Sequence, residues 1–522
     1  MSLLGVDVGT SAVKAVAFSE AGEALASASA VYTRHPGLDE ENEQDADVFW
    51  EAFTEAVRTT AGQTRSDRIT ALAIAAHGET IVPVDRAGQP CGPALLNRDH
   101  RSGPLIPAWE ARFGRMDVYS RTGLPLHAMY SLPKIDWLRR TRPQAFSLSH
   151  RFATVAGFLG LRMGLPHVVD YTLASRTMGF DITRRAWSED LLDFAGVSPG
   201  SFGEALPSGT FVGKLDAEHA RELSLDPGAG VVLGGHDQPC GALGAGAVAA
   251  GQAVDSAGSY ECVTVVSDRP RNTADSLRFS LNSCPHVVAG QYVTLGFFPS
   301  GLVADWMLTA FFERDDPAGT APRSYEAVEA EVQGLGEEPT SICLTPHLIG
   351  SINPHWDLRA SLSMSGIRAH HGKYHLYKAL WEGIACELNA TLQALVETGG
   401  PISDLVIFGG GSRWDYGVQL RADVTARPLR RLRDAQAVCR GAALLAGLGT
   451  GVYRGPEQAV GLTIPAADEF TPRADLVPRY AEQARKYAAL YEGLGEYRLL
   501  DDSAGAPGPD ARTETAAKGQ RR

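Results

Sequence analysis

Cysteine is sparse in this chain and is not arranged in pairs. The seven cysteines, at positions 91, 240, 262, 284, 343, 386 and 439, are scattered, odd in number and without a Cys-x-x-Cys pair. Zinc sites and disulfide frameworks use cysteines at short, regular spacing. The pattern therefore excludes both and indicates reduced thiols in a cytoplasmic protein.

Long apolar runs and an excess of positive charge are also missing. No stretch of about 18 apolar residues is free of charges, so we expect no membrane span. The segment from Met1 to Asp7 has no basic region followed by a long apolar run, so it is not typical of a signal peptide. With 48 basic against 61 acidic residues, the formal net charge of −13 argues against nucleic acid as a partner.

Glycine, in contrast, is abundant. It supplies 56 of the 522 residues, more than the usual share of about 7%. Because glycine costs conformational entropy on folding, such a surplus often marks tight turns and backbone that approaches a ligand. A chain of this length is expected to form two or three domains.

The beginning of the chain predicts strands joined by a small-residue turn. An apolar run over residues 3–8 is followed by Gly9-Thr10-Ser11, and further strands are expected over 13–18 and 23–31. In Rossmann and P-loop folds the glycine-rich turn opens a helix, whereas this turn opens a second strand. Backbone N–H groups and hydroxyls here could bind phosphate while Asp7 holds a hydrated Mg²⁺. The alternative is a hairpin turn with a solvated aspartate.

The same pattern of a strand, a small-residue turn and a second strand is repeated after Gly251. Residues 253–263 again give a strand, an acidic residue, a turn of small residues and a second strand. This internal similarity predicts a duplication with two related α/β domains that face each other, and a boundary near 246–252. We divide the chain into residues 1–248, residues 249–490 and a disordered tail over 491–522, whose clearest part begins at Asp501.

Spacing of apolar residues predicts the other elements. Helices are expected over 45–61, 131–140, 152–163, 374–396, 416–425 and 439–448, and strands over 69–75, 231–233 and 405–408.

Three loops after predicted strands carry candidate functional residues. Asp237, at the end of an apolar strand and beside glycines, could act as a general base toward a hydroxyl, or could instead cap a helix. His77 and Glu79 could hold a polyol by hydrogen bonds, although a lone histidine is more often structural. Gly409-Gly410-Gly411 leaves room for a flat ring against the backbone, or forms a loop without a ligand.

Taken in order, these segments resemble the FGGY family of carbohydrate kinases over nearly the whole chain, from Leu3 to about Leu490. The matching segments are residues 5–14, the acidic stretch 43–45 with Phe49-Trp50, residues 129–138 around Lys134-x-x-Trp137, residues 170–181, Gly235-His236-Asp237, residues 256–259 and residues 408–412. Two positions depart from the family pattern, since Thr141 stands at the end of the Lys-x-x-Trp signature and Ala257 in the second phosphate turn.

The resemblance implies two actin-like (ribonuclease H-like) domains that flank an interdomain cleft for ATP and sugar. It implies ATP-dependent phosphorylation of a sugar hydroxyl, with Asp237 as the catalytic base. The sugar would bind at His77, Gly78, Glu79 and Asp237, and Mg²⁺ at Asp7 and Asp237. The nucleotide would bind at Gly9, Thr10, Ser11, Lys14, Gly258, Ser259, Gly409, Gly410, Gly411 and Ser412. Dimers are common among such kinases, which leaves a homodimer open.

The resemblance is less specific about the substrate. Xylulokinases usually carry Gln-Met-His-Gly in the loop after the third buried strand, and glycerol kinases carry Gln-Arg-Glu. This chain has Ala76-His77-Gly78-Glu79-Thr80, and its sugar loop 96–101 has an altered middle. We expect a neutral ketopentose such as xylulose; a polyol (glycerol or erythritol), gluconate and deoxyketoses remain alternatives. Two other classes stay open, a non-catalytic regulatory relative and a chaperone-type ATPase, although no peptide-binding domain is expected after residue 450.

Overall fold

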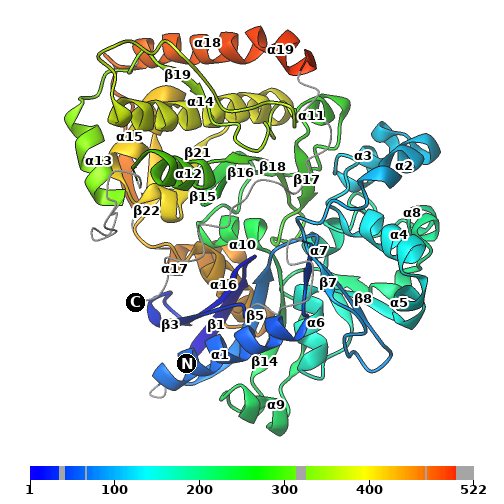
Figure 1. The fold of residues 1–522 in the computed structure, drawn as a ribbon. Helices are drawn as coiled ribbons and strands as arrows, with labels where there is room; N and C mark the ends of the chain where they lie inside the picture. The colour runs from blue at the N-terminus through cyan, green and yellow to red at the C-terminus, as the bar shows by residue number, and fades with distance from the viewer. Residues whose placement is uncertain (34–41, 65–66, 313–324, 465–466, 501–522) are drawn as a thin grey trace, which may run out of the picture.

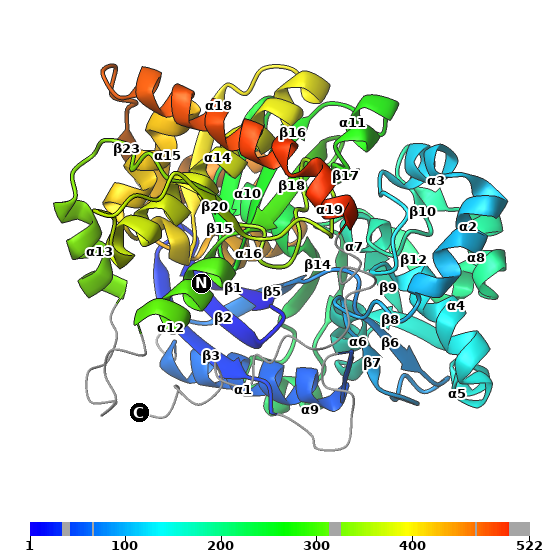
Figure 2. The ribbon, with the colours of Figure 1, turned by 45° about the horizontal axis from the view of Figure 1, so that its top comes forward.

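The computed structural model describes residues 1–33, 42–64, 67–312, 325–464 and 467–500. They form two α/β parts, each built around a central sheet with helices packed on it (Figures 1 and 2). In spatial order, the first sheet comprises β13 (Phe211–Lys214), β14 (Gly230–His236), β5 (Ile69–Ala76), β1 (Ser2–Val8), β2 (Ala12–Ser19) and β3 (Ala24–Val31). The second comprises β17 (Asn282–Pro285), β18 (Tyr292–Pro299), β16 (Tyr260–Ser267), β15 (Gln252–Ala257), β21 (Asp404–Phe408), β22 (Leu429–Leu432) and β23 (Ala467–Phe470).

The two sheets repeat one pattern of strand pairing. In the first sheet β1 pairs antiparallel with β2 and parallel with β5, and β5 pairs parallel with β14. In the second sheet β15 pairs antiparallel with β16 and parallel with β21, and β21 pairs parallel with β22. The repeated topology agrees with the duplication predicted from the sequence, whereas the division at residue 248 stays a prediction.

Helices and small sheets surround this framework. The helices of the first part are α1 (Asp47–Gln63), α2 (Ile106–Phe113), α3 (Arg115–Thr122), α4 (Ser131–Thr141), α5 (Pro143–Leu148), α6 (Val155–Arg162), α7 (Tyr171–Ser175), α8 (Glu189–Ala195), α9 (Ala217–Glu222) and α10 (Asp237–Gly244). Those of the second part are α11 (Ala274–Arg278), α12 (Gly301–Phe312), α13 (Tyr325–Gly334), α14 (Lys373–Gly399), α15 (Asp415–Thr425), α16 (Ala437–Gly449), α17 (Pro456–Thr463), α18 (Val477–Gly493) and α19 (Gly495–Leu500). The short strands are β4 (Glu43–Gln44), β6 (Ile81–Val84), β7 (Ala94–Leu95) and β8 (Arg151–Thr154) in one sheet, and the pairs β9 (Val168–Asp170) with β12 (Glu204–Leu206), β10 (Phe180–Asp181) with β11 (Ala186–Trp187), and β19 (Cys343–Thr345) with β20 (Ser363–Ser365).

Two expectations about local structure are wrong. The helix predicted over 152–163 starts only at Val155, because the preceding residues pair with β6 as strand β8. Thr154 then caps the helix, its hydroxyl oxygen accepting a hydrogen bond of 3.2 Å from the amide of Gly157. The tail predicted from residue 491 is helical up to Leu500 in α18 and α19, and residues 501–522 lie outside the described residues.

Glycines bring helix α16 of the second part against the first sheet and against α10. A Cβ on Gly5 of β1 would lie 1.7 Å from the carbonyl oxygen of Cys439 in α16. A Cβ on Gly441 of α16 would likewise lie 1.8 Å from the carbonyl oxygen of Cys240 in α10. No side chain fits at these distances, so part of the glycine surplus serves packing between the two parts.

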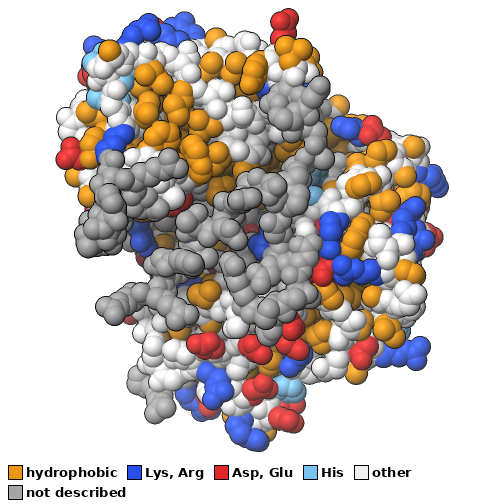
Figure 3. Space-filling view, viewed as in Figure 1, with side chains coloured by type: hydrophobic (Ala, Val, Ile, Leu, Met, Phe, Trp, Pro, Cys, Tyr) orange, Lys and Arg blue, Asp and Glu red, His pale blue; other side chains and the backbone are white. Residues whose placement is uncertain are grey.

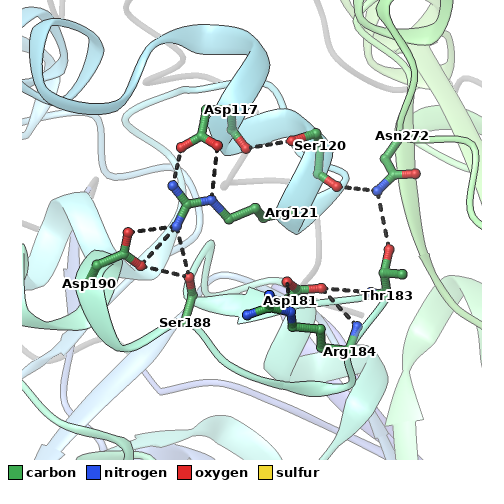
Figure 4. Close-up of polar contacts among 9 residues, drawn as sticks. All are labelled: Asp117, Ser120, Arg121, Asp181, Thr183, Arg184, Ser188, Asp190 and Asn272. Carbon is green, nitrogen blue, oxygen red and sulfur yellow. Dashed lines mark hydrogen bonds and ion pairs between the residues drawn. The ribbon is translucent and has the colours of Figure 1, made fainter.

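A polar seam also joins the two parts beside α3 (Figure 4). Asn272, which precedes α11, donates hydrogen bonds to the carbonyl of Ser120 and, at 3.5 Å, to the hydroxyl of Thr183. Arg121 lies next to this contact, bound by the carboxylates of Asp117 and Asp190. The seam holds α3 of the first part close to the segment that precedes α11 in the second.

The surface seen in Figure 3 is uneven in character. Hydrophobic side chains gather over α12, where Trp306 and Phe311 are exposed, and acidic side chains gather below, over α1 and α9. Within the described residues no helix is both long and apolar enough to cross a membrane.

Candidate active site

Asp237 lies where the sequence predicts it, directly after a buried strand. It follows β14 and is the first residue of α10, whose N-cap position is occupied by His236. Within the described part of the chain, its Oδ1 has no hydrogen-bond partner; Nε2 of His236 is 3.2 Å away but is not placed to donate. Burial, followed by the nearby charges of Asp7 and Glu79, raises the pKa of Asp237 to about 8. A carboxylate so placed is available to accept a proton from a bound hydroxyl.

Asp7 lies on β1, close enough to Asp237 for its charge to raise that pKa. Burial raises the pKa of Asp7 itself to about 6, and Lys14, its partner across β1 and β2, opposes the shift. The turn after Asp7 is closed by hydrogen bonds, since the Gly9 amide donates to Ala12 (3.0 Å) and the Tyr32 hydroxyl donates to the Gly9 carbonyl (2.7 Å). Thr10 and Ser11 of this turn are exposed, so their hydroxyls are accessible to a phosphate.

The pair Asp7 and Asp237 has the chemistry of a magnesium site. Mg²⁺ in phosphoryl-transfer sites uses one or two carboxylates together with phosphate and water. The unpaired Oδ1 of Asp237 beside a second carboxylate fits this requirement. Clusters of three or more His, Cys, Asp or Glu side chains able to hold a metal are not found in the described ranges, and a site of this kind does not need one.

The second phosphate turn lies between β15 and β16. Gly258 and Ser259 are exposed, and their carbonyls accept hydrogen bonds of 3.1 Å from the amides of Gly301 and Ser300 respectively. The start of α12 is thereby fixed to the turn. Ser259 supplies an exposed hydroxyl at this turn.

The glycine triplet after β21 packs directly on this turn. Gly409 has φ +106°, and a Cβ there would lie 2.5 Å from the carbonyl oxygen of Ala257, which precedes Gly258. Gly411 also approaches Ala257, whereas Gly410 faces open space. The hydroxyl of Ser412 donates to the Gly409 carbonyl at 2.8 Å. The two predicted nucleotide elements of the second part are thus brought together.

Replacing Gly409 tests this arrangement. We expect Gly409→Ala to raise the KM for ATP at least about tenfold, because alanine is disfavoured at positive φ and its Cβ would push the two turns apart. Measurement of KM for ATP and for the sugar separates this effect from a general loss of structure. Gly399→Ala, at a position where a Cβ meets open space, is the control and should leave both constants unchanged. An unchanged KM for ATP in Gly409→Ala would contradict the assignment.

Both ring nitrogens of His77 already have protein partners. Nδ1 lies 3.0 Å from the carbonyl oxygen of Val8, and Nε2 lies 2.8 Å from the hydroxyl of Thr80. Burial lowers the pKa of His77, so the ring is neutral. In this arrangement the histidine orients the loop between β5 and β6, and its predicted contact with the sugar stays a prediction.

Glu79 is paired with an arginine from another element. Its carboxylate binds Arg176, which follows α7, in a buried ion pair. Gly78 makes room for this partner, because a Cβ there would lie 2.8 Å from Cγ of Arg176. Arg176 therefore fills the space beside Gly78 and pairs with Glu79. Arg176 also contacts the second part of the chain, because its Nη1 donates a hydrogen bond of 3.0 Å to Oδ1 of Asn282.

Arg176, Asn282, Tyr130 and Lys134 were not among the predicted site residues. The Tyr130 hydroxyl donates to the same Asn282 oxygen at 3.0 Å, and Nζ of Lys134 donates to the Glu79 carbonyl at 2.7 Å. Arg176, Tyr130 and Lys134 lie inside the segments that carry the family resemblance. The partners named above, however, are 55 to 152 positions away in the chain, and a single sequence gives no signal for such contacts.

Gly234 and Gly235, which lie on β14 just before Asp237, are needed for close packing of this strand. A Cβ on Gly234 would lie 1.9 Å from the carbonyl oxygen of Ile74, and one on Gly235 would lie 2.6 Å from the side chain of Val287. Protein atoms cover both positions. These glycines allow β14 to approach its neighbours closely.

Two family models together cover most of the chain. The N-terminal domain of the FGGY family of carbohydrate kinases matches residues 2–244, and the C-terminal domain of the same family matches residues 253–450.

Relatives and solved structures agree with this match. A xylulose kinase of Staphylococcus epidermidis is 26% identical over 496 residues, which cover 94% of this chain and 96% of the relative. A gluconokinase of Bacillus subtilis is 24% identical over 506 residues, covering 95% and 98% of the two chains. The structure of ligand-bound xylulose kinase from Lactobacillus acidophilus superposes with a TM-score of 0.86 at 20% identity, covering 96% and 99%.

Proposed function

The chain belongs to the FGGY family of carbohydrate kinases, and we propose that it transfers the γ-phosphoryl group of ATP to a hydroxyl of a ketopentose such as xylulose, with Asp237 as general base. The observation that carries this proposal is the carboxylate of Asp237 directly after β14, whose Oδ1 makes no hydrogen bond within the described residues and whose pKa is raised by the nearby charges of Asp7 and Glu79. A polyol and gluconate remain alternative acceptors, since a gluconokinase stands beside the xylulose kinases among the relatives.

In this mechanism the sugar hydroxyl is bound beside Asp237 and loses its proton to the carboxylate. The hydroxyl oxygen forms a bond to the γ-phosphorus as the bond from that phosphorus to the bridging oxygen of ADP breaks. Phosphoryl transfer depends mainly on positioning and charge stabilisation. Mg²⁺ held by Asp7 and Asp237 would offset the negative charge of the phosphoryl oxygens.

The turns after Asp7 and after Ala257 supply the other groups. Hydroxyls of Thr10, Ser11 and Ser259 and the adjacent backbone amides would bind phosphate oxygens. The Gly409–Ser412 turn would accept the adenosine, because glycine leaves the backbone accessible to a flat ring. Since the two phosphate turns belong to different parts of the chain, closure of one part on the other would position ATP against the sugar.

Release of ADP over a panel of acceptors tests the proposal. With Mg²⁺ and ATP, we expect ADP release that depends on added sugar and is fastest with a ketopentose such as D-xylulose. The panel also contains glycerol, erythritol, D-gluconate and a deoxyketose. Absence of acceptor-dependent ADP release across the whole panel would refute the kinase activity and favour a non-catalytic, sugar-binding role.

A further inference from the structure

The ion pair of Glu79 and Arg176 neutralises a positive charge near the reacting carboxylate of Asp237. Both side chains are only 6% exposed. Nε of Arg176 donates to Glu79, and Nη1 donates to Asn282. Arg176 is close enough to Asp237 for its charge to lower the pKa of Asp237, while Glu79 raises it. The pair therefore presents no net charge to a substrate bound beside Asp237.

Among the residues that the structure describes, other cations near this loop are also engaged. Nζ of the buried Lys134 donates to the carbonyls of Glu79 and Leu96, each at 2.7 Å. Burial lowers the pKa of Lys134 to about 7, which weakens it as a permanent cation. Arg101 of the sugar loop is bound by the carboxylates of Asp99 and Glu43. Arg98 of the same loop has a partner as well.

An uncharged series of rings continues from the sugar loop to the second phosphate turn. Neighbouring ring centroids lie 5.1 to 6.5 Å apart along His100, His127, Trp356, Phe297 and Tyr260. Burial lowers the pKa of both histidines, that of His127 to about 4, so neither is charged at neutral pH.

This series of rings lies close to the reacting centre. Phe297 pairs in register with Cys262. The thiol of Cys262 is near enough to Asp237 and Arg176 for their charges to shift its pKa.

We infer that the acceptor is an uncharged ketose or polyol, and that Glu79 is the residue that discriminates against sugar acids. This inference rests on the proposed kinase activity. The carboxylate of an aldonate would lose its hydration beside Glu79 and Asp237, and it would find Arg176 already neutralised. A neutral sugar instead offers hydroxyls that donate to the two carboxylates.

The test compares acceptors that differ only in charge. Alditols and aldonates of four, five and six carbons form matched pairs in which a terminal CH₂OH is replaced by COO⁻. We expect the wild-type protein to favour the alditol of each pair at least about 100-fold, in kcat/KM or in competition against the best acceptor. A tighter or faster aldonate at any chain length would overturn the inference.

The variant Glu79→Gln tests whether Glu79 is the residue that discriminates between alditols and aldonates. It keeps the shape of the side chain and a hydrogen-bonding group for Arg176 but leaves the arginine charge uncompensated. We expect the preference for alditols to fall at least about tenfold, mainly because aldonates improve. Glu382→Gln removes another buried carboxylate, which lies on α14 and accepts hydrogen bonds from Thr340, and should leave the ratio unchanged. An equal ratio in wild type and Glu79→Gln would overturn the assignment to Glu79.

The matched pairs are measured with the wild-type protein, so the substrate-class inference does not depend on folding of a variant. Failure of the inference is also distinct from failure of the proposed function. If ADP is released equally well with aldonates, the kinase activity stands and the inference fails. If no acceptor of either class supports ADP release, the kinase activity itself fails.

Discussion

Asp237→Asn is expected to lower kcat about 10³-fold while ATP binding and folding persist. General-base catalysis typically contributes 10²- to 10⁴-fold, and an asparagine amide cannot accept the hydroxyl proton. The replacement is nearly isosteric, and Oδ1 of Asp237 makes no hydrogen bond within the described structure that asparagine would break. The measurements are steady-state ADP release, nucleotide affinity and thermal unfolding.

The pH dependence of kcat/KM is a second test of Asp237 as the general base. A base works only when deprotonated, so an elevated pKa makes wild-type turnover fall as the pH is lowered through that value. With the pKa of Asp237 raised to about 8 in the free protein, kcat/KM should rise with pH through the neutral range. The residual activity of Asp237→Asn should lack this rise. Bound Mg²⁺ would move the midpoint downward and leave the direction unchanged.

The control for this experiment is Asp226→Asn. Asp226 is exposed and pairs with Arg68 at the surface, where such pairs contribute little to stability. Its replacement should leave kcat and its pH dependence as in the wild type. Full activity in Asp237→Asn would exclude Asp237 as the base.

Local signals in the sequence were sufficient for the framework of the fold. Periodicity alone places β1, β5, α14 and α15 within three residues of their observed ends. The similarity between residues 3–13 and 253–263 corresponds to two sheets with the same pairing pattern. Such signals depend on neighbouring residues, which is why one sequence suffices for them.

The same reasoning could not predict contacts between residues that lie far apart in the sequence. The sequence alone does not show whether a glycine faces a ligand or packs against a helix. Gly409 lies at positive φ against Ala257, as a nucleotide turn suggests, whereas Gly234 and Gly441 are required by backbone that packs within 2 Å of their missing Cβ. Likewise, the sequence does not show which residue packs beside Gly78 in the loop between β5 and β6. Only the fold shows that Arg176 fills the space.

Arg176→Met should have the second large effect, because it leaves Glu79 charged and buried without its partner. Breaking a buried ion pair from one side costs about 3–5 kcal/mol. Oδ1 of Asn282 would also lose the hydrogen bond from Arg176 and keep only the one from Tyr130. We expect a loss of unfolding free energy of that size and a rise in the KM for the sugar. Loss of the nearby positive charge should also raise the pKa of Asp237 further, shifting the rise of activity toward higher pH.

A double-mutant cycle separates loss of the partner from loss of the arginine itself. Arg176→Met combined with Glu79→Gln removes both charges, so the double variant should be more stable than Arg176→Met alone. Arg68→Met breaks an exposed pair and should cost less than about 1 kcal/mol. If Arg176→Met were as mild as Arg68→Met, or if the Glu79 replacement brought no recovery, the buried pair would not be what holds Glu79 beside Asp237. Recovery of stability without recovery of sugar binding would instead show that the pair is needed in its charged form to position the acceptor.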